Sequence, residues 1–371
     1  MPLYLTEDQA MLRDTAREFV AAEGSVAKQL RHYRDKNCSD GFGHRLWKQF
    51  AEMGFTGILV DEADGGLGLG HVEAGIVLEE IGRNLTPSPF LITAVAVVEA
   101  LKGTALKKRW LPGILAGDTV AALAVDEGPK HRPEAIAMQA ERAGNGFRLS
   151  GRKQFVVQGA SADFFVVAVM TADGLTLFAV EKDAKGLGVE GVRLADSSIG
   201  ARLAFENVEV DADAVIGEVG QGEAVLKRVL NAGRAGVASE MVGLGSAAMG
   251  MTVEYLRQRK QFGRLIGEFQ SLQHRSAHLY SELEIARAAA LKAQQLLDEG
   301  SDEAEAMVSV AKAKAGQVST LAVQEGVQMH GGIGMTDEYD IGLYMKRDRV
   351  LNELFGDANY HADRLARLKG Y

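Results

Sequence analysis

The 371-residue chain has one cysteine, Cys38, only six prolines, and no long apolar run free of charges. A single cysteine excludes an internal disulfide and a cysteine-rich metal site. No apolar stretch approaches the ~18 residues of a membrane-spanning helix, and the first residues do not resemble a signal peptide, so we expect a cytoplasmic protein. The chain also has no excess of positive charge, since 50 acidic residues outnumber 41 lysines and arginines and the net charge is −9. A general binder of nucleic acid or of anionic membranes is therefore not expected.

Glycine, by contrast, is abundant. There are 43 glycines, and many lie in apolar or alanine-rich runs such as residues 236–250. Small residues at such positions allow helices to approach closely, or allow a flat ligand to lie against the backbone. The chain is also long for a single hydrophobic core, so we expect two or three packed units.

The hydrophobic pattern changes twice along the chain. Residues 1–117 have helical spacing, beginning with Thr6 as a helix N-cap. Residues 118–215 contain short β-branched or aromatic runs, and the predicted strands are 121–125, 147–149, 164–170, 175–180 and 203–210. Helical spacing returns from Gly222. The sequence therefore predicts an α+β protein with an N-terminal helical domain (1–117), a middle β-barrel-like domain (118–215) and a C-terminal four-helix bundle (216–371).

Two segments have the residue types that a phosphate-linked cofactor requires. The first is Arg259-Lys260-Gln261-Phe262-Gly263, followed by Gln270. Its planar guanidinium suits a pyrophosphate, although an arginine at an exposed helix end is the structural alternative. The second is Gln328 with Gly331-Gly332-Ile333-Gly334, whose backbone N–H groups suit a phosphate, with an ordinary glycine helix stop as the alternative. We expect His330 to be packed or capping, because no partner suggests a metal site.

These segments resemble the flavin-binding signature of the acyl-CoA dehydrogenase family, and the resemblance covers nearly the whole chain. It implies the fold of that family, noncovalent FAD, and an acyl-CoA thioester that is dehydrogenated at its α and β carbons to the 2-enoyl-CoA. It also implies a homo- or heterotetramer that passes electrons to an electron-transferring flavoprotein. The cofactor-binding residues that it implies are Arg259, Phe262, Gln270, Gln328, Gly331, Gly332, Phe155 and Val157.

Several positions depart from the family's pattern. The segment Gly151–Gly159 resembles a strand beside the flavin, but Phe155 replaces a tryptophan and Val157 replaces a residue with a hydroxyl group. The backbone N–H of Val157 could still donate a hydrogen bond. A loop of small residues and serine in the family is Lys-His-Arg at residues 130–132 here. These cations suit a CoA phosphate, and a solvated basic loop is the alternative.

The catalytic base is the largest departure. Family members often carry a glutamate in a Tyr-Glu-Gly-Thr loop, where this chain has Gly356 followed by Asp357. Some relatives place the base just before a family arginine that resembles Arg234, and that position is a glycine here. The resemblance implies a substrate-binding role for Arg234. We expect Asp357 or Glu240 to be the base, with the pairing of Glu240 to an arginine as the structural alternative.

Because three departures fall around the reactive edge of the flavin, other functions stay open. One is a non-catalytic or half-site FAD-clamping subunit of a heteromeric acyl-CoA dehydrogenase. Another is related flavin chemistry on a substrate without CoA, in which an aspartate serves as base. Bleaching of bound flavin by an acyl-CoA discriminates between these functions and the dehydrogenase.

Overall fold

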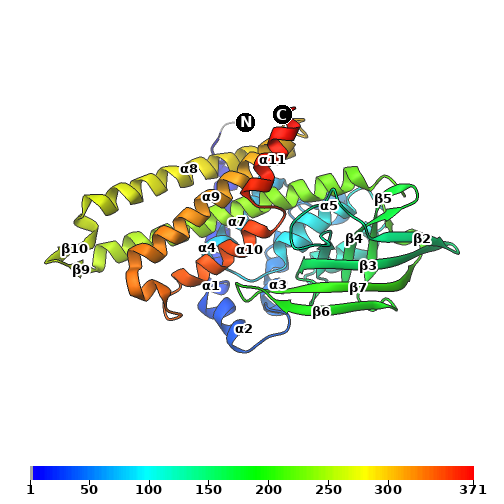
Figure 1. Cartoon of the computed structure of the whole chain (residues 1–371), viewed down its shortest axis with the longest axis horizontal. Coiled ribbons are helices and arrows are strands. Elements are labelled where there is room, and N and C mark those ends of the chain that lie inside the picture. Colours follow the sequence, from blue (N-terminus) through cyan, green and yellow to red (C-terminus); the bar gives the residue numbers. More distant parts are fainter. Residues whose placement is uncertain (1–2) are drawn as a thin grey trace. The chain divides into compact units, whose positions relative to one another are not determined.

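A computed structural model of the chain describes residues 3–371. Along the chain, helices come first, then a run of strands, then helices again (Figure 1). The described residues form two compact units. One contains the N-terminal stretch that ends at Arg31, with His71–Thr86 and Arg234–Tyr371, and the other contains His32–Gly70 and Pro87–Gly233. The domain boundaries after residues 117 and 215 stay predictions.

The second unit contains an eight-stranded sheet in the order β6-β7-β3-β2-β4-β5-β8, with β1 paired in parallel to β4. The strands are β1 (Ala121–Ala124), β2 (Gln139–Ala143), β3 (Gly146–Val157), β4 (Phe164–Thr171), β5 (Gly174–Glu181), β6 (Leu187–Arg193), β7 (Ile199–Val210) and β8 (Val215–Ile216). The five predicted runs lie in β1, β3, β4, β5 and β7. Their apolar side chains form one core that includes Phe147, Leu149, Phe165 and Phe178.

The same unit also contains helices, and two of them contact the sheet. The helices are α2 (His32–Asp35), α3 (His44–Glu52), the π-helical Phe90–Val97, which continues into α5 (Val98–Leu101), and α6 (Lys107–Leu115). Thr93 joins the π-helix to β1, because its hydroxyl donates to the Ala121 carbonyl at 2.9 Å and accepts from the Ala121 N–H at 3.0 Å. Trp110 of α6 stacks on Phe164 of β4, with ring centroids 4.0 Å apart.

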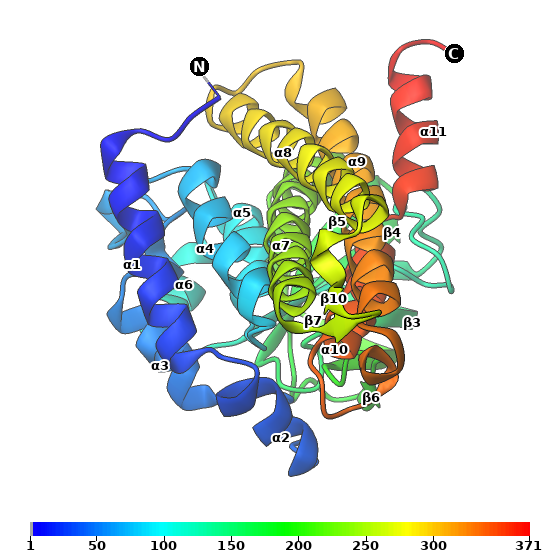
Figure 2. The same cartoon turned by 90° about the vertical axis from the view of Figure 1, so that its left-hand side faces the viewer.

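The first unit is helical. It contains α1 (Glu7–Glu23), α4 (His71–Asn84), the part of α7 (Gly222–Gln258) that begins at Arg234, α8 (Gln270–Asp298), α9 (Ala304–His330), α10 (Ile341–Glu353) and α11 (Ala358–Leu368). Thr6 caps α1 as predicted, in a reciprocal capping box with Gln9. Helix α9 contacts α8, α10 and α11, and α8 and α9 lie side by side (Figure 2). Among residues 3–371, no helix has the length and hydropathy needed to cross a membrane.

Two glycines allow α4 and α7 to touch through their backbones. A Cβ on Gly82 of α4 would lie 1.9 Å from the Glu240 carbonyl oxygen, and one on Gly243 of α7 would lie 1.8 Å from the Glu79 carbonyl oxygen. No side chain fits at either position. The close helix approach predicted from the glycine-rich run 236–250 is therefore confirmed at this crossing.

Candidate functional site

The first predicted cofactor segment is a tight hairpin that follows α7. Strands β9 (Lys260–Gln261) and β10 (Arg264–Leu265) are antiparallel and are joined by Phe262 and Gly263. Both turn residues have positive φ, 54° and 78°, as a two-residue hairpin of type I′ requires. This conformation is strained for phenylalanine, and the Phe262 side chain is nevertheless 90% exposed. An exposed aromatic on a strained turn is suited to contact a ligand or another chain.

The hairpin base fixes the backbone of Arg259 and leaves its side chain in solvent. The Arg259 N–H donates to the Tyr255 carbonyl at 2.9 Å, and its carbonyl accepts from the Ile266 N–H at 2.8 Å. Arg259 itself is exposed. Gln270, the first residue of α8, is exposed as well. Both predicted cofactor side chains are thus available at the surface of this unit.

The second predicted segment is an open glycine turn at the end of α9. Gln328 is exposed in the last turn of the helix, and Gly331 has φ of 64°, a conformation that favours glycine. A Cβ on Gly331 or on Gly332 would have no atom within 4 Å. The backbone here faces open space, and a phosphate-linked cofactor such as FAD fits such a turn.

An aromatic cluster joins the two segments. The rings of Tyr255 and His330 have centroids 4.5 Å apart, and those of His330 and Tyr339 are 4.7 Å apart. His330 Nδ1 donates to the Gly326 carbonyl at 2.6 Å. Tyr255 lies one helical turn before Arg259, and His330 directly precedes Gly331. The structure therefore brings the arginine hairpin and the glycine turn together, and His330 is packed as predicted.

The predicted flavin-side strand is β3, and its bulge gives Phe155 an unusual conformation. The pairing of β3 with β7 shifts register between Lys153 and Val156, and Phe155 within this bulge has φ of 50°. Its side chain is half-buried, while Val157 is buried. A phenylalanine in the left-handed region costs on the order of 1–3 kcal/mol, and such strain often occurs at functional sites.

A buried lysine anchors this bulge. Lys153 Nζ contacts Glu127 Oε1 at 2.7 Å and donates to the Val125 carbonyl at 3.0 Å. Burial lowers the pKa of the lysine, and the Glu127 carboxylate opposes that shift. Glu127 also accepts from the backbone N–H groups of Ala137 and Met138, at 2.9 and 3.0 Å. The later part of β3 and the loop between β1 and β2 are thereby held together.

The basic loop differs from a row of three solvated cations. His131 is buried, with Nδ1 3.0 Å from the carboxylate of Asp126. Lys130 and Arg132 are exposed. The loop therefore presents two cations to solvent, and the histidine has a structural partner.

Asp357, the predicted base of the C-terminal loop, is the N-cap of α11. Its Oδ1 accepts from the Tyr360 N–H at 2.8 Å. The two residues before it have positive φ, 60° for Phe355 and 101° for Gly356. Asp357 is partly buried, and one of its carboxylate oxygens accepts the hydrogen bond that begins the helix.

Three buried cationic or imidazole side chains hold the backbone of this loop. Lys312 of α9 donates to the carbonyls of Gly356 at 2.9 Å and Leu351 at 3.0 Å. His361 Nε2 lies 3.1 Å, and Arg234 Nε 3.3 Å, from the Phe355 carbonyl oxygen. Burial lowers the pKa of Lys312 to about 7 and that of Arg234 to about 10, with repulsion from a neighbouring arginine as the second cause in each case.

This network changes how Arg234 can act on a substrate. The residue is only 2% exposed, and its Nη2 donates to the Tyr360 hydroxyl oxygen at 3.1 Å. Arg234 therefore contacts the loop that carries Asp357. Its role in substrate binding stays a prediction, and any such effect would be indirect, through the position of this loop.

Glu240, the other predicted base, is buried in α7 against Arg347 of α10. Its Oε1 accepts from Arg347 Nε at 2.9 Å and from Nη2 at 2.7 Å. A two-point contact between an arginine and a carboxylate is a strong, charge-assisted contact. This geometry favours the structural alternative for Glu240.

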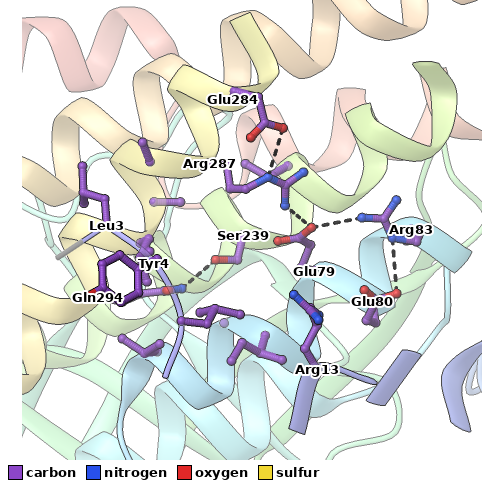
Figure 3. Close-up of a pocket in the computed structure, with 18 of the residues that line it drawn as sticks. Leu3, Tyr4, Arg13, Glu79, Glu80, Arg83, Ser239, Glu284, Arg287 and Gln294 are labelled. Carbon is purple, nitrogen blue, oxygen red and sulfur yellow. Dashed lines mark hydrogen bonds and ion pairs between the residues drawn. The ribbon is translucent and has the colours of Figure 1, made fainter. Parts of the chain in front are cut away.

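The helical unit also contains a cavity of about 360 Å³ among α1, α4, α7 and α8 (Figure 3). Glu79 pairs there with Arg83 at 3.0 Å and with Arg287, and Gln294 donates to Ser239 Oγ at 2.6 Å. The residues predicted to hold cofactor or substrate do not line it. The lining contains both arginines and glutamates, and ion pairs such as Arg17–Glu80 and Arg287–Glu79 connect neighbouring helices. The cavity is therefore not lined by charge of one sign.

Sequence comparison identifies the class of protein to which this fold and these segments belong. The model of the acyl-CoA dehydrogenase N-terminal domain matches residues 6–118, and that of the C-terminal domain matches residues 220–369. Isovaleryl-CoA dehydrogenase of Solanum tuberosum is 32% identical over 83% of this chain and 78% of its own length. Cyclohex-1-ene-1-carbonyl-CoA dehydrogenase of Geobacter metallireducens is 30% identical over 96% of each chain.

A solved structure agrees with these relatives. The Tcur3481-Tcur3483 steroid ACAD variant superposes with a TM-score of 0.90, at 30% identity and over 98% of each chain. The chain belongs to the acyl-CoA dehydrogenase family and is an oxidoreductase of that type. The predicted fold, with N-terminal helices, a central sheet and C-terminal helices, is confirmed. Members of this family bind FAD, and heteromeric complexes occur among the homologues.

Some residues of the site were not predicted. Lys312, Tyr360 and His361 shape the loop around Gly356, yet none belongs to a motif. A weak signal exists for Lys312, which lies on the same helix face as Val308 and Ala315, both buried. A lysine on an apolar face predicts a buried cation but does not reveal its partners.

Proposed function

We propose that this chain catalyses the FAD-dependent α,β-dehydrogenation of an acyl-CoA thioester to the 2-enoyl-CoA, with electrons passed on to an electron-transferring flavoprotein. The proposal is carried by one observation, the Tyr255–His330 contact that brings the exposed Arg259 hairpin and the open Gly331 turn together. When bound, FAD supplies the hydride acceptor for the β carbon.

The cofactor-binding roles follow from residue chemistry. Arg259 would make a charge-assisted contact to the pyrophosphate, and the amides of Gln270 and Gln328 would donate or accept at the polar parts of the cofactor. The backbone N–H groups of Gly331 and Gly332 would face a phosphate. Phe155 and Val157 would contact the flavin ring of a bound FAD through an aromatic face and a backbone N–H.

We also propose that the Arg259 hairpin serves the flavin of a neighbouring subunit in a homo- or heterotetramer. The exposure of the Phe262 ring on a strained turn supports this role. In such an assembly, FAD binds only the assembled form and stabilises it by linkage. Light scattering of the purified chain with and without FAD tests this point. A fully loaded monomer would contradict it.

The α-proton acceptor is assigned to Asp357, with Glu240 as the second candidate. Asp357 is partly exposed and belongs to the loop where the family often has its base, whereas Glu240 is buried against Arg347. The thioester carbonyl would be stabilised by backbone N–H groups as charge develops on it. We assign no particular acyl group, because the names of the relatives given above indicate branched, cyclic and steroid substrates.

The experiment that tests the cofactor assignment uses two arginines with the same charge. Arg259→Ala should weaken FAD binding about 10- to 150-fold, because a charge-assisted hydrogen bond contributes roughly 1.5–3 kcal/mol. Arg257→Ala removes another exposed arginine, two residues earlier, and is the control. FAD titration by fluorescence measures both. Equal losses for the two variants would remove the specific role of Arg259.

A second candidate function is a half-site FAD-clamping subunit of a heteromeric acyl-CoA dehydrogenase. It is favoured by the loop itself, in which Gly356 has no side chain and Asp357 is engaged at the start of α11. Such a subunit would bind FAD but would not bleach it with any acyl-CoA unless a second, related chain were present. Co-expression with such a chain, followed by the same bleaching assay, distinguishes the two functions.

A further inference from the structure

The ring of Tyr360 lies where a side chain at position 356 would begin. A Cβ on Gly356 would be 2.3 Å from Tyr360 Cδ1 and 2.9 Å from both Cγ and Cε1. Cβ contacts below 3.0 Å essentially never occur, so one of the two residues would have to move. Gly356 also has φ of 101°, which is unfavourable for any L residue.

Tyr360 is held at both ends, so its ring cannot simply turn away. At one end its backbone N–H donates to Asp357 Oδ1 at 2.8 Å. At the other end its hydroxyl accepts from Arg234 Nη2 at 3.1 Å, and the guanidinium carbon lies 5.5 Å from the centre of the ring. Arg234 is itself fixed by burial and by the Phe355 carbonyl. The ring of Tyr360 is therefore held in one position beside residue 356.

The backbone of the loop cannot relax away from the ring either. Lys312 holds the carbonyl of Gly356 at 2.9 Å, and His361 and Arg234 both contact the carbonyl of Phe355. All three anchoring side chains are almost completely buried. Moving the backbone at position 356 would break several hydrogen bonds to charged or buried groups at once.

We propose that Tyr360 closes position 356 to any side chain and so excludes a carboxylate base from that point of the loop. Gly356 and Tyr360 are then sterically coupled. A carboxylate side chain could be placed at position 356 only if the ring at position 360 were also replaced. The proton acceptor for a substrate must then be a carboxylate at another position, and Asp357 is the nearest one along the chain. This inference rests on the proposed function for its catalytic meaning, but the steric pair stands on the loop geometry alone.

A double-mutant cycle tests the pair without any ligand. Gly356→Ala should lower the melting temperature by several degrees, and Tyr360→Ala should lower it by a separate amount. In the double variant the two losses should be clearly less than additive, because the ring overlap has gone while the strained φ remains. The Tyr360→Phe variant, which keeps the ring, should give no such relief. Additive losses, or relief with phenylalanine as well, would overturn the steric pair.

The catalytic meaning is tested with Gly356→Glu and Gly356→Glu/Tyr360→Ala, both loaded with FAD. Flavin reduction by an acyl-CoA should rise on the order of 100-fold in the double variant over Gly356→Glu alone, the scale of a positioned base. Equal reduction rates in the two variants would overturn the exclusion of a base by Tyr360. If the parental chain does not bind FAD, the proposed function fails, while the melting cycle still decides the steric pair.

Discussion

Arg347 donates to Glu240 through two nitrogens, Nε at 2.9 Å and Nη2 at 2.7 Å, and both bonds end on the same carboxylate oxygen. Glu240 is 2% exposed, so this contact joins α7 to α10 inside the helical unit. With Arg347 in place, the main role of Glu240 is to hold the two helices together.

The first prediction follows from this pair. Glu240→Gln should destabilise the fold by about 3–5 kcal/mol, because Arg347 is left without a countercharge in a largely buried place. Glu353→Gln provides the control, since its partner Arg349 is exposed and a surface pair is worth about 1 kcal/mol or less. Urea unfolding measures both. A stable Glu240→Gln variant that no longer reduces its flavin would instead identify Glu240 as the base.

The second prediction concerns Asp357. Asparagine caps helices about as well as aspartate, so Asp357→Asn should keep the start of α11 and the stability of the fold. Flavin reduction by acyl-CoA should nevertheless fall by about 10²–10⁴-fold, because an amide cannot take the α-proton. Stopped-flow absorbance at matched FAD content is the measurement. A parental rate in this variant would show that Asp357 is only a helix cap.

The third prediction uses the strained backbone of Phe155. Both Phe155→Ala and Phe155→Gly remove the ring and should weaken FAD binding, but only glycine relieves the positive φ. The glycine variant should therefore be more stable than the alanine variant by about 1 kcal/mol, the reverse of the usual order within a strand. Thermal unfolding without FAD compares them. An alanine variant as stable as the glycine variant would mean that the bulge is not strained.

The fourth prediction concerns acid pH. His361 is fully buried, and burial together with the charges of Arg234 and Lys312 lowers its pKa to about 2. In the unfolded chain its imidazole titrates near 6.5, so below about pH 6.5 the unfolded state binds a proton that the folded state does not. His361 should thus lower the free energy of unfolding as the pH falls, by at most about 1.4 kcal/mol per pH unit.

The matched variant for this prediction is His361→Gln, which can still donate to the Phe355 carbonyl but does not titrate. Its stability should fall less steeply than that of the parent between pH 6.5 and pH 5. Urea unfolding at several pH values gives both slopes. Equal slopes would show that His361 is protonated in the folded chain.

The sequence predicts the elements whose physics is local. Thr6 with Gln9 satisfies the start of α1 within one turn, and the alternating or continuous apolar runs of β4 and β5 are visible without tertiary context. Strand β2 was missed because its Gln-Ala-Glu-Arg-Ala sequence is largely polar, and β6 because none of its seven residues is buried and two are glycines. These two strands form because their backbones pair with β3 and β7, respectively, although neither has a strong apolar pattern of its own.

For the candidate site, too, the sequence predicts local motifs but not the long-range contacts. Motif spacing identifies Arg259 and Gln328, but the Tyr255–His330 contact that joins them depends on the packing of two long helices. The role of Glu240 also depended on a partner more than a hundred residues away, Arg347. The overlap between Gly356 and Tyr360 requires atomic positions, because residues four apart in a helix-entry loop can lie in many arrangements.

The central claim is that this chain binds FAD and uses it to oxidise an acyl-CoA thioester. The most direct measurement is the absorbance of bound flavin in the purified, FAD-loaded chain during anaerobic titration with a panel of short, branched and cyclic acyl-CoA thioesters. The chain should be yellow, and at least one thioester should bleach it, with release of the 2-enoyl-CoA. A chain that holds FAD but stays oxidised with every thioester would contradict dehydrogenation by this chain alone, and a chain that never retains FAD would contradict the account as a whole.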